Sequence, residues 1–105
     1  MTDTPLGNFY PVISVSNTDK IILPAANRRR TITLYQTFNT TLTITFGSAA
    51  TYQQGMVIIT GTQPITFVRD SSQCVGIEVG SLIDQEVHAI AGGVGTVGAI
   101  VTYDP

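Results

Sequence analysis

Hydrophobic and polar residues alternate in two stretches of the chain. Ile32 and Leu34 alternate with polar residues in the first stretch, and Leu42, Ile44 and Phe46 alternate with threonines in the second. A period of two is typical of β-strands, because successive side chains point to opposite faces of a sheet. We expect each stretch to be a strand with one apolar face in the core and one threonine-rich face outside.

Further apolar runs rich in β-branched residues recur along the chain, with turn-forming residues between them. This spacing is typical of a β-sandwich or a β-barrel. The predicted strands cover residues 12–15, 20–23, 29–36, 42–47, 56–60, 65–69, 75–79, 86–91 and 97–103.

The strands at 29–36 and 42–47 are predicted to pair as a hairpin. A two-residue turn would place Leu34 on the same face as Thr45 and so mix core and solvent faces. The turn should therefore have an odd number of residues. A three-residue loop would pair Phe38 with Leu42, and a five-residue loop would pair Thr37 with Thr43.

Composition favours an all-β domain, since Thr, Ile and Val make up 38 of the 105 residues and β-branched side chains fit a pleated sheet better than a helix. Strands with one apolar face must bury that face against a second sheet. We predict an antiparallel two-sheet β-sandwich of the jelly-roll type over residues 12–105, with a small closed barrel as the second choice.

Residues 1–11 are predicted to form an extended N-terminal arm outside the sandwich. Two prolines and a glycine discourage a central strand there. Leu6, Phe9 and Tyr10 are costly to leave exposed, which predicts that the arm docks on a neighbouring subunit.

Charged residues make up 11% of the chain, and the net charge is −2, whereas charged residues form about 25% of typical soluble domains. An uncharged polar surface loses its water at low cost, which favours a subunit covered by neighbours, in a homo-oligomer, over a monomer with a threonine-rich surface. The composition also argues against a disordered chain and a polybasic nucleic-acid arm. The glycine-containing uncharged tract 89–103 is shorter than the roughly 20 residues that span a bilayer.

The candidate chemical groups are few. Asp84, Glu86 and His88 alternate along one predicted strand and could ligate a cation, but same-face neighbours lie ~7 Å apart, so a solvated or partner-facing strand is the favoured interpretation. Cys74 opens an apolar run, which predicts a buried structural thiol rather than a nucleophile. We therefore predict no catalytic residue, no metal site and no cofactor.

Arg28, Arg29 and Arg30 form the one basic cluster. They could remain solvated, pair with carboxylates of a neighbouring subunit, or bind nucleic acid. Because the net charge is negative and no second basic cluster accompanies them, nucleic-acid binding ranks last. Planar guanidinium groups suit two-point contacts with carboxylates, so these residues join Leu6, Phe9 and Tyr10 as a predicted partner interface.

The chain also resembles a known class of proteins. The residues concerned are Pro-Ala-Ala-Asn-Arg-Arg-Arg-Thr-Ile-Thr-Leu-Tyr-Gln-Thr from position 24, Leu-Thr-Ile-Thr-Phe-Gly from 42, Gly-Met-Val-Ile-Ile from 55 and Ile-Thr-Phe from 65. Over residues 24–103 this order is similar to that of small β-sandwich virion proteins of tailed bacteriophages, which decorate heads or accompany tails.

The resemblance implies a non-enzymatic structural subunit located in the virion. Its expected role is a capsid decoration or cementing protein whose partner is the major capsid protein or another virion structural protein. The alternative is a receptor- or glycan-binding module of a tail or fibre. That alternative has less support from the residues, because the chain has no tryptophan to form a sugar platform.

Overall fold

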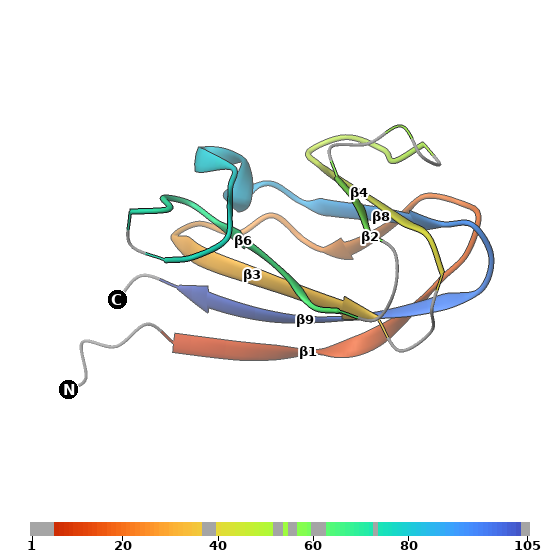
Figure 1. The fold of residues 1–105 in the computed structure, drawn as a ribbon, viewed down its shortest axis with the longest axis horizontal. Helices are drawn as coiled ribbons and strands as arrows, with labels where there is room; N and C mark the ends of the chain where they lie inside the picture. Colours follow the sequence, from red (N-terminus) through yellow and green to blue (C-terminus); the bar gives the residue numbers. More distant parts are fainter. Residues whose placement is uncertain are drawn as a thin grey trace.

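In a computed structural model, the described part of the chain forms β-strands and one short 3-10 helix (Figure 1). The structure describes residues 6–36, 40–51, 54, 57–59, 63–72 and 74–103, with their side chains apart from those of 6–12 and 57–59. The elements are β1 (Leu6–Val15), β2 (Lys20–Leu23), β3 (Arg29–Gln36), β4 (Leu42–Phe46), β5 (Val57–Ile59), β6 (Ile65–Val68), β7 (Ile77–Glu78), η1 (Gly80–Asp84), β8 (Val87–Ala91) and β9 (Gly95–Tyr103).

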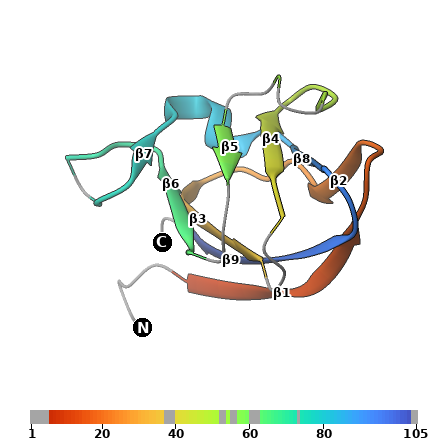
Figure 2. The ribbon, with the colours of Figure 1, turned by 45° about the vertical axis from the view of Figure 1, so that its right-hand side comes forward.

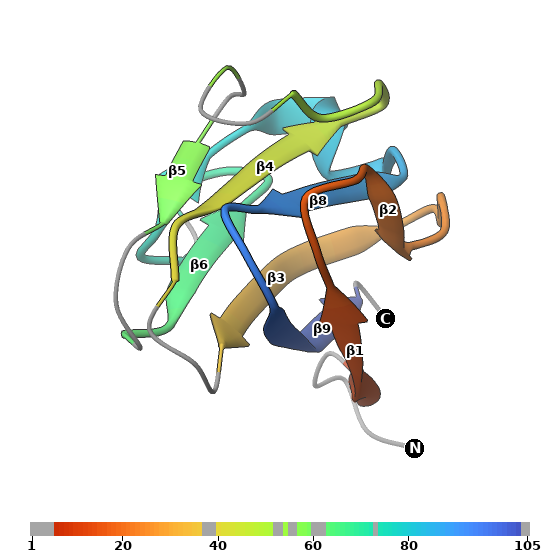
Figure 3. The same ribbon diagram turned by 90° about the vertical axis from the view of Figure 1, so that its right-hand side faces the viewer.

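The strands lie in two layers, which Figure 3 shows nearly end-on. Sheet A has the order β1-β9-β3-β6-β7, and sheet B has the order β2-β8-β4-β5. All neighbouring strands are antiparallel except β6 and β7. The prediction of an all-β two-sheet sandwich is confirmed, and the sheets do not close into a barrel.

The order of pairing identifies the topology as a jelly roll. β1 pairs with β9 and β3 with β6 in sheet A, whereas β2 pairs with β8 and β4 with β5 in sheet B. Early strands thus pair with late ones, alternately in the two sheets. The chain is one long hairpin with its tip between β4 and β5, wound into a sandwich (Figure 2).

The predicted hairpin between 29–36 and 42–47 is wrong, because β3 lies in sheet A and β4 lies in sheet B. The chain crosses between the sheets after Gln36. Thr37 and Phe38, which carried the two proposed registers, lie outside the described residues. The alternation correctly identified the buried residues of each strand, but a period of two gives a face and does not give a partner strand.

The core lies between the two sheets. It is built from the apolar residues that alternate with polar ones along the strands. Ile32 and Leu34 are buried on β3, and Leu42, Ile44 and Phe46 are buried on β4. A ring pair joins the layers, since Phe46 and Phe67 pack edge to face with ring centroids 5.1 Å apart. Such a pair contributes about 0.5–1.5 kcal/mol beyond its buried area.

The predicted N-terminal arm is wrong for residues 6–11, because β1 begins at Leu6 and pairs with β9 from Leu6–Tyr103 to Val15–Gly95. Residues 1–5 lie outside the described part of the chain. The pairing shifts register between Tyr10 and Ile13, and Pro11 lies in this irregular part of an edge strand. Proline is tolerated at such a position because no ladder N–H is required there.

The run from Cys74 to Ile77 was expected to be a buried strand, and this expectation is also wrong. Val75 is 96% exposed and Ile77 is 41% exposed, while Cys74 is half-buried. The strand here is reduced to β7, which lies at the edge of sheet A and pairs with two residues of β6. Apolar residues in succession therefore marked an edge segment and not a core strand.

Candidate functional site

The outer face of sheet A carries uncharged side chains over its three central strands. Its larger outward residues are half-buried, and we call them the threonine face: Thr31, Thr33, Tyr35, Thr66, Thr96, Ile100 and Thr102. They alternate with core residues such as Ile32, Leu34 and Val101. The outward positions of β3 from Thr31 onward, and those paired with them on β6 and β9, are uncharged, while the half-buried Arg30 lies just outside this register at the start of β3.

Hydroxyl groups on the threonine face bond to one another across neighbouring strands. Thr31 and Thr102 place their Oγ1 atoms 2.5 Å apart, and Thr33 and Thr66 place theirs 3.0 Å apart. Each pair satisfies polar groups that would otherwise depend on water. Covering this face with another protein would therefore leave few polar groups without a partner.

Tyr35 is the large aromatic residue of the threonine face, and its ring lies over Gly98 on the neighbouring strand. A Cβ atom at position 98 would come within 2.2 Å of Tyr35 Cζ. Glycine is required because any larger residue would displace the ring from the sheet. The ring is thus held against β9 and not extended into solvent, which gives the face a rigid aromatic element.

Arg29 is fully buried, although the sequence predicted it as an interface residue. Its Nη1 donates to the carbonyl oxygens of Ile83 at 3.1 Å and Gln85 at 2.9 Å, and its Nη2 donates to the carbonyl oxygen of Pro24. The guanidinium group therefore fixes η1 and the chain after it to the start of β3. Arg29 has a structural role within its own chain.

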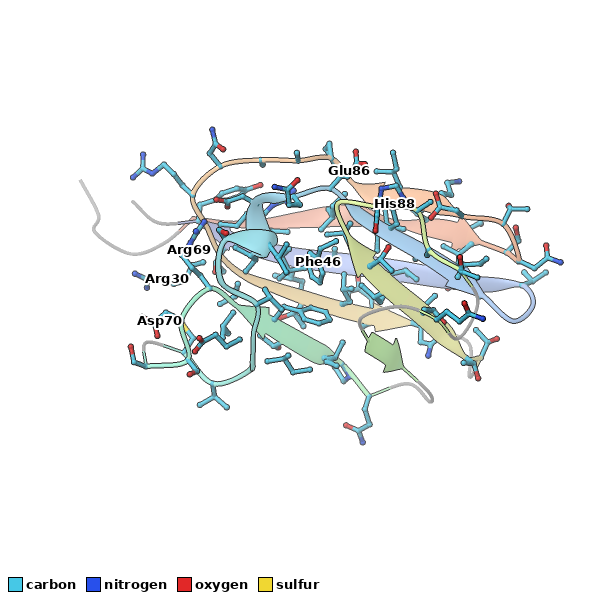
Figure 4. All side chains as sticks on the ribbon, turned by 90° about the horizontal axis from the view of Figure 1, so that it is seen from above. Arg30, Phe46, Arg69, Asp70, Glu86 and His88 are labelled. Atoms are coloured by element: carbon cyan, nitrogen blue, oxygen red, sulfur yellow. The ribbon has the colours of Figure 1, made fainter. Side chains whose placement is uncertain are left out.

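Three further hydrogen bonds complete this cluster. Asp84 Oδ1 accepts from the backbone N–H of Arg29 at 3.1 Å and from Arg69 Nη2 at 2.6 Å. Arg69 Nε also donates to the carbonyl oxygen of Arg29 at 3.0 Å. An ion pair and backbone hydrogen bonds thus hold three segments that are distant in sequence, and Figure 4 shows Arg69 and Arg30 at this end of the molecule.

Simple alternation along β3 would place Arg29 outward, on the same face as Thr31, but the strand is irregular at its start. Arg29 pairs with Tyr103 and Thr31 with Thr102, so the intervening Arg30 is an extra residue on β3. Such a bulge reverses the alternation and turns Arg29 inward. Arg28 is exposed with a φ of 66°, and Arg30 is half-buried. Their assignment to a partner interface stays a prediction.

A second polar cluster surrounds the single histidine of the chain, on the outer face of sheet B. His88 Nδ1 lies 3.1 and 3.0 Å from the two carboxylate oxygens of Asp19, and Nε2 lies 2.8 Å from Glu86 Oε1. The side chain of His88 is 7% exposed, against 30% for Asp19 and 40% for Glu86. Glu86 and His88 are adjacent in Figure 4.

The balance of forces on His88 favours its charged form. Burial lowers its pKa, but the hydrogen bonds to Glu86 and Asp19 and the negative charges of both carboxylates outweigh burial and raise the pKa above the ordinary value of 6.5. Hydrogen bonding to the charged form stabilises it. Both ring nitrogens are occupied by carboxylates, so this imidazole has no lone pair available to act as a base.

The three residues proposed as alternative metal ligands do not form one site. Asp84 belongs to η1 and binds Arg69, whereas Glu86 binds His88. The carboxylates of Asp19 and Glu86 lie against different nitrogens of the ring, so they cannot converge on one ion. Among the described residues, no group of three His, Cys, Asp or Glu side chains is arranged to hold a metal ion.

The structure leaves part of the predicted interface undescribed. The backbones of Leu6, Phe9 and Tyr10 lie in β1, and their side chains are outside what the structure describes. Sequence reasoning missed Asp19, whose partner His88 is 69 residues away. A contact of that range leaves no local pattern, whereas the same-face spacing of Glu86 and His88 did indicate theirs.

Comparisons with protein-family models, with curated proteins and with solved structures found no match to this chain. Within the part of the chain that the structure describes, no helix has the length and apolar character needed to cross a membrane.

Proposed function

We propose that this protein is a non-enzymatic structural subunit of a bacteriophage particle. Its role is that of a decoration or cementing subunit, which binds the capsid lattice as a small homo-oligomer and stabilises it. The partner is the major capsid protein or another virion structural protein. The surface that we assign to the shell contact is the threonine face of sheet A.

The observation that carries this proposal is the uncharged character of that face. Its hydroxyl groups pair with one another, as in Thr31–Thr102 and Thr33–Thr66. Because no charge has to lose its water, covering the face costs little free energy, and tyrosine is a common anchor at the centre of protein interfaces. Tyr35, held over Gly98, is such an anchor.

The topology and the sequence resemblance support the same class of protein. Jelly rolls are used repeatedly in viral capsid proteins and lectins. The segments that resemble phage virion proteins include β3, β4 and β6, which supply part of the core and part of the threonine face. Fold alone does not assign a function, so the proposal depends on the surface and not on the topology.

The principal titratable groups are engaged inside the molecule. His88 binds Asp19 and Glu86, and Asp84 binds Arg69. The Asp19–His88 and Asp84–Arg69 pairs connect separate segments of the sandwich, which is a structural use of groups that an enzyme would direct at a substrate. This use supports the non-enzymatic part of the proposal.

Quantitative mass spectrometry of purified phage particles from the source of this chain tests the proposal. A decoration subunit should be present at hundreds of copies, in a fixed ratio to the major shell protein. Its absence from the particles would reject a virion role, and a dozen copies or fewer would move the subunit to the neck or tail.

A glycan-binding module of a tail or fibre is the second candidate, and Tyr35 is the residue that favours it. A flat aromatic ring beside threonine hydroxyls can stack on a sugar face. Screening the protein on a glycan array, with Tyr35→Ala as the control, separates the two candidates. Sugar binding that depends on Tyr35 would favour the module, whereas the decoration role requires none.

A further inference from the structure

The hydrogen bonds of His88 require two N–H donors. A neutral imidazole has one N–H and one lone pair, and an ionised carboxylate can only accept. Asp19 faces Nδ1 at 3.0 Å and Glu86 faces Nε2 at 2.8 Å. With a carboxylate accepting at each ring nitrogen, the imidazolium form alone satisfies both contacts.

The protonation of His88 also influences a third segment of the chain, through Asp19. Asp19 Oδ1 also accepts from the backbone N–H of Ala50 at 2.7 Å. Ala50 belongs to residues 47–51, which follow β4, and Thr45 Oγ1 donates to the carbonyl oxygen of Ser48 at 2.6 Å. We call residues 47–51 the covering segment.

The covering segment lies over the outer face of sheet B, above β4 and β8 in Figure 1. Thr45 and His88 are paired residues of that face and are 6% and 5% exposed. Ala50 is 6% exposed, although it follows three exposed residues. The segment therefore contacts Thr45 of the sheet through Ser48, and it contacts Asp19, the residue before β2, through the N–H of Ala50.

We propose that protonated His88 is a clasp that holds the covering segment on sheet B, and that loss of its proton releases the segment. A neutral ring would place a lone pair against one carboxylate. The neutral ring that keeps its proton on Nε2 turns the lone pair of Nδ1 toward Asp19, which then withdraws from the ring and from the Ala50 N–H together. The outer face of β4 and β8 then becomes accessible in a pH-dependent manner.

The charged groups near His88 are the two carboxylates, which stabilise its protonated form and so favour a clasp that is closed at low pH. The residues paired with His88 across the sheet, Ile21 of β2 and Thr45 of β4, are uncharged. Ser48 and Ala50 of the covering segment, which bond to Thr45 and Asp19, are uncharged as well. Lys20 is exposed and pairs with Ala89. The pKa of His88 is raised in the folded protein, so the clasp is fully closed below about pH 6.5 and opens as pH rises through the folded pKa.

Two NMR measurements on the whole chain test the clasp. The chain has one histidine, so its ring ¹⁵N signals need no assignment and report directly whether both nitrogens carry protons. Amide hydrogen exchange at Ala50, corrected for intrinsic base catalysis, reports release of the segment. The reference amide is Val79, which bonds to the Val68 carbonyl oxygen at 2.9 Å in sheet A.

We expect a doubly protonated ring at pH 6.5 and a titration midpoint above this value. As the ring loses its proton, protection of Ala50 relative to Val79 should fall about tenfold, the effect of losing one charge-assisted hydrogen bond. A constant ratio through the titration, or a midpoint at or below 6.5, would overturn the proposal.

Asp19→Asn is the matched variant. Its amide oxygen can still accept from the Ala50 N–H, and its amide NH₂ can donate to the lone pair of a neutral ring. The covering segment should therefore stay closed at every pH tested, with a constant ratio of Ala50 to Val79 protection. A pH-dependent ratio in Asp19→Asn as large as in the parent would show that His88 does not control the segment.

Discussion

The ring of Tyr35 fills the space above Gly98, its partner on the neighbouring strand, since a Cβ atom on residue 98 would lie 2.2 Å from Tyr35 Cζ. Gly98→Ala should therefore displace the ring and destabilise the protein by about 1 kcal/mol. The measurement is the free energy of unfolding in urea.

The same change in a Tyr35→Ala background should be neutral or stabilising, because alanine is favoured over glycine in a strand when no ring opposes it. Equal costs of Gly98→Ala in the two backgrounds would contradict the placement of the ring.

Arg29→Lys should destabilise the sandwich by about 2 to 4 kcal/mol, since an ammonium group cannot reach carbonyl oxygens on both sides as the guanidinium does. Those oxygens belong to Pro24, Ile83 and Gln85. The matched control is Arg30→Lys, which should cost well under half as much. Chemical denaturation of both variants checks this, and similar costs would show that the burial of Arg29 is unimportant.

Leu34→Ala should destabilise the protein by about 2 to 4 kcal/mol, because it leaves a cavity at a core residue that is 1% exposed. Thr33→Ala removes one hydroxyl contact with Thr66 and should cost less than half as much. Thermal unfolding of the two variants compares the faces of β3 directly, and equal shifts in Tm would contradict the face assignment.

The pH dependence of stability should reflect His88. Its folded pKa is raised above the unfolded value, so its contribution is fully present below about pH 6.5 and is lost as pH rises through the folded pKa. Urea unfolding at successive pH values should show this decline in the parent and little of it in His88→Gln. Stability that rises over the same window, with the rise depending on His88, would contradict the sign.

The sequence predicted the strands well because alternation and turn residues are local signals. β2 and β3 have the expected bounds, and Ile32 and Leu34 are buried as the pattern indicated. Strand partners were not predictable in the same way. β3 and β4 are neighbours in sequence but lie in different sheets, because a jelly roll pairs early strands with late ones.

The candidate site was predictable only in part. The threonines of β3 gave its outer face, but their partners Thr66 and Thr102 come from distant strands. Arg29 was misplaced because a bulge at Arg30 reverses the alternation, and a run of three arginines gives no signal of that bulge. Asp19 was missed since its contact with His88 depends on tertiary structure.

The central claim is that the threonine face binds the shell of the particle. Site-specific photo-cross-linking in assembled particles tests it most directly, with a photoreactive phenylalanine at position 33 on that face and, as the control, at exposed position 48 above sheet B. We predict cross-links from position 33 to the major shell protein and few from position 48. Cross-links to the shell from position 48 alone would contradict the assignment of the threonine face.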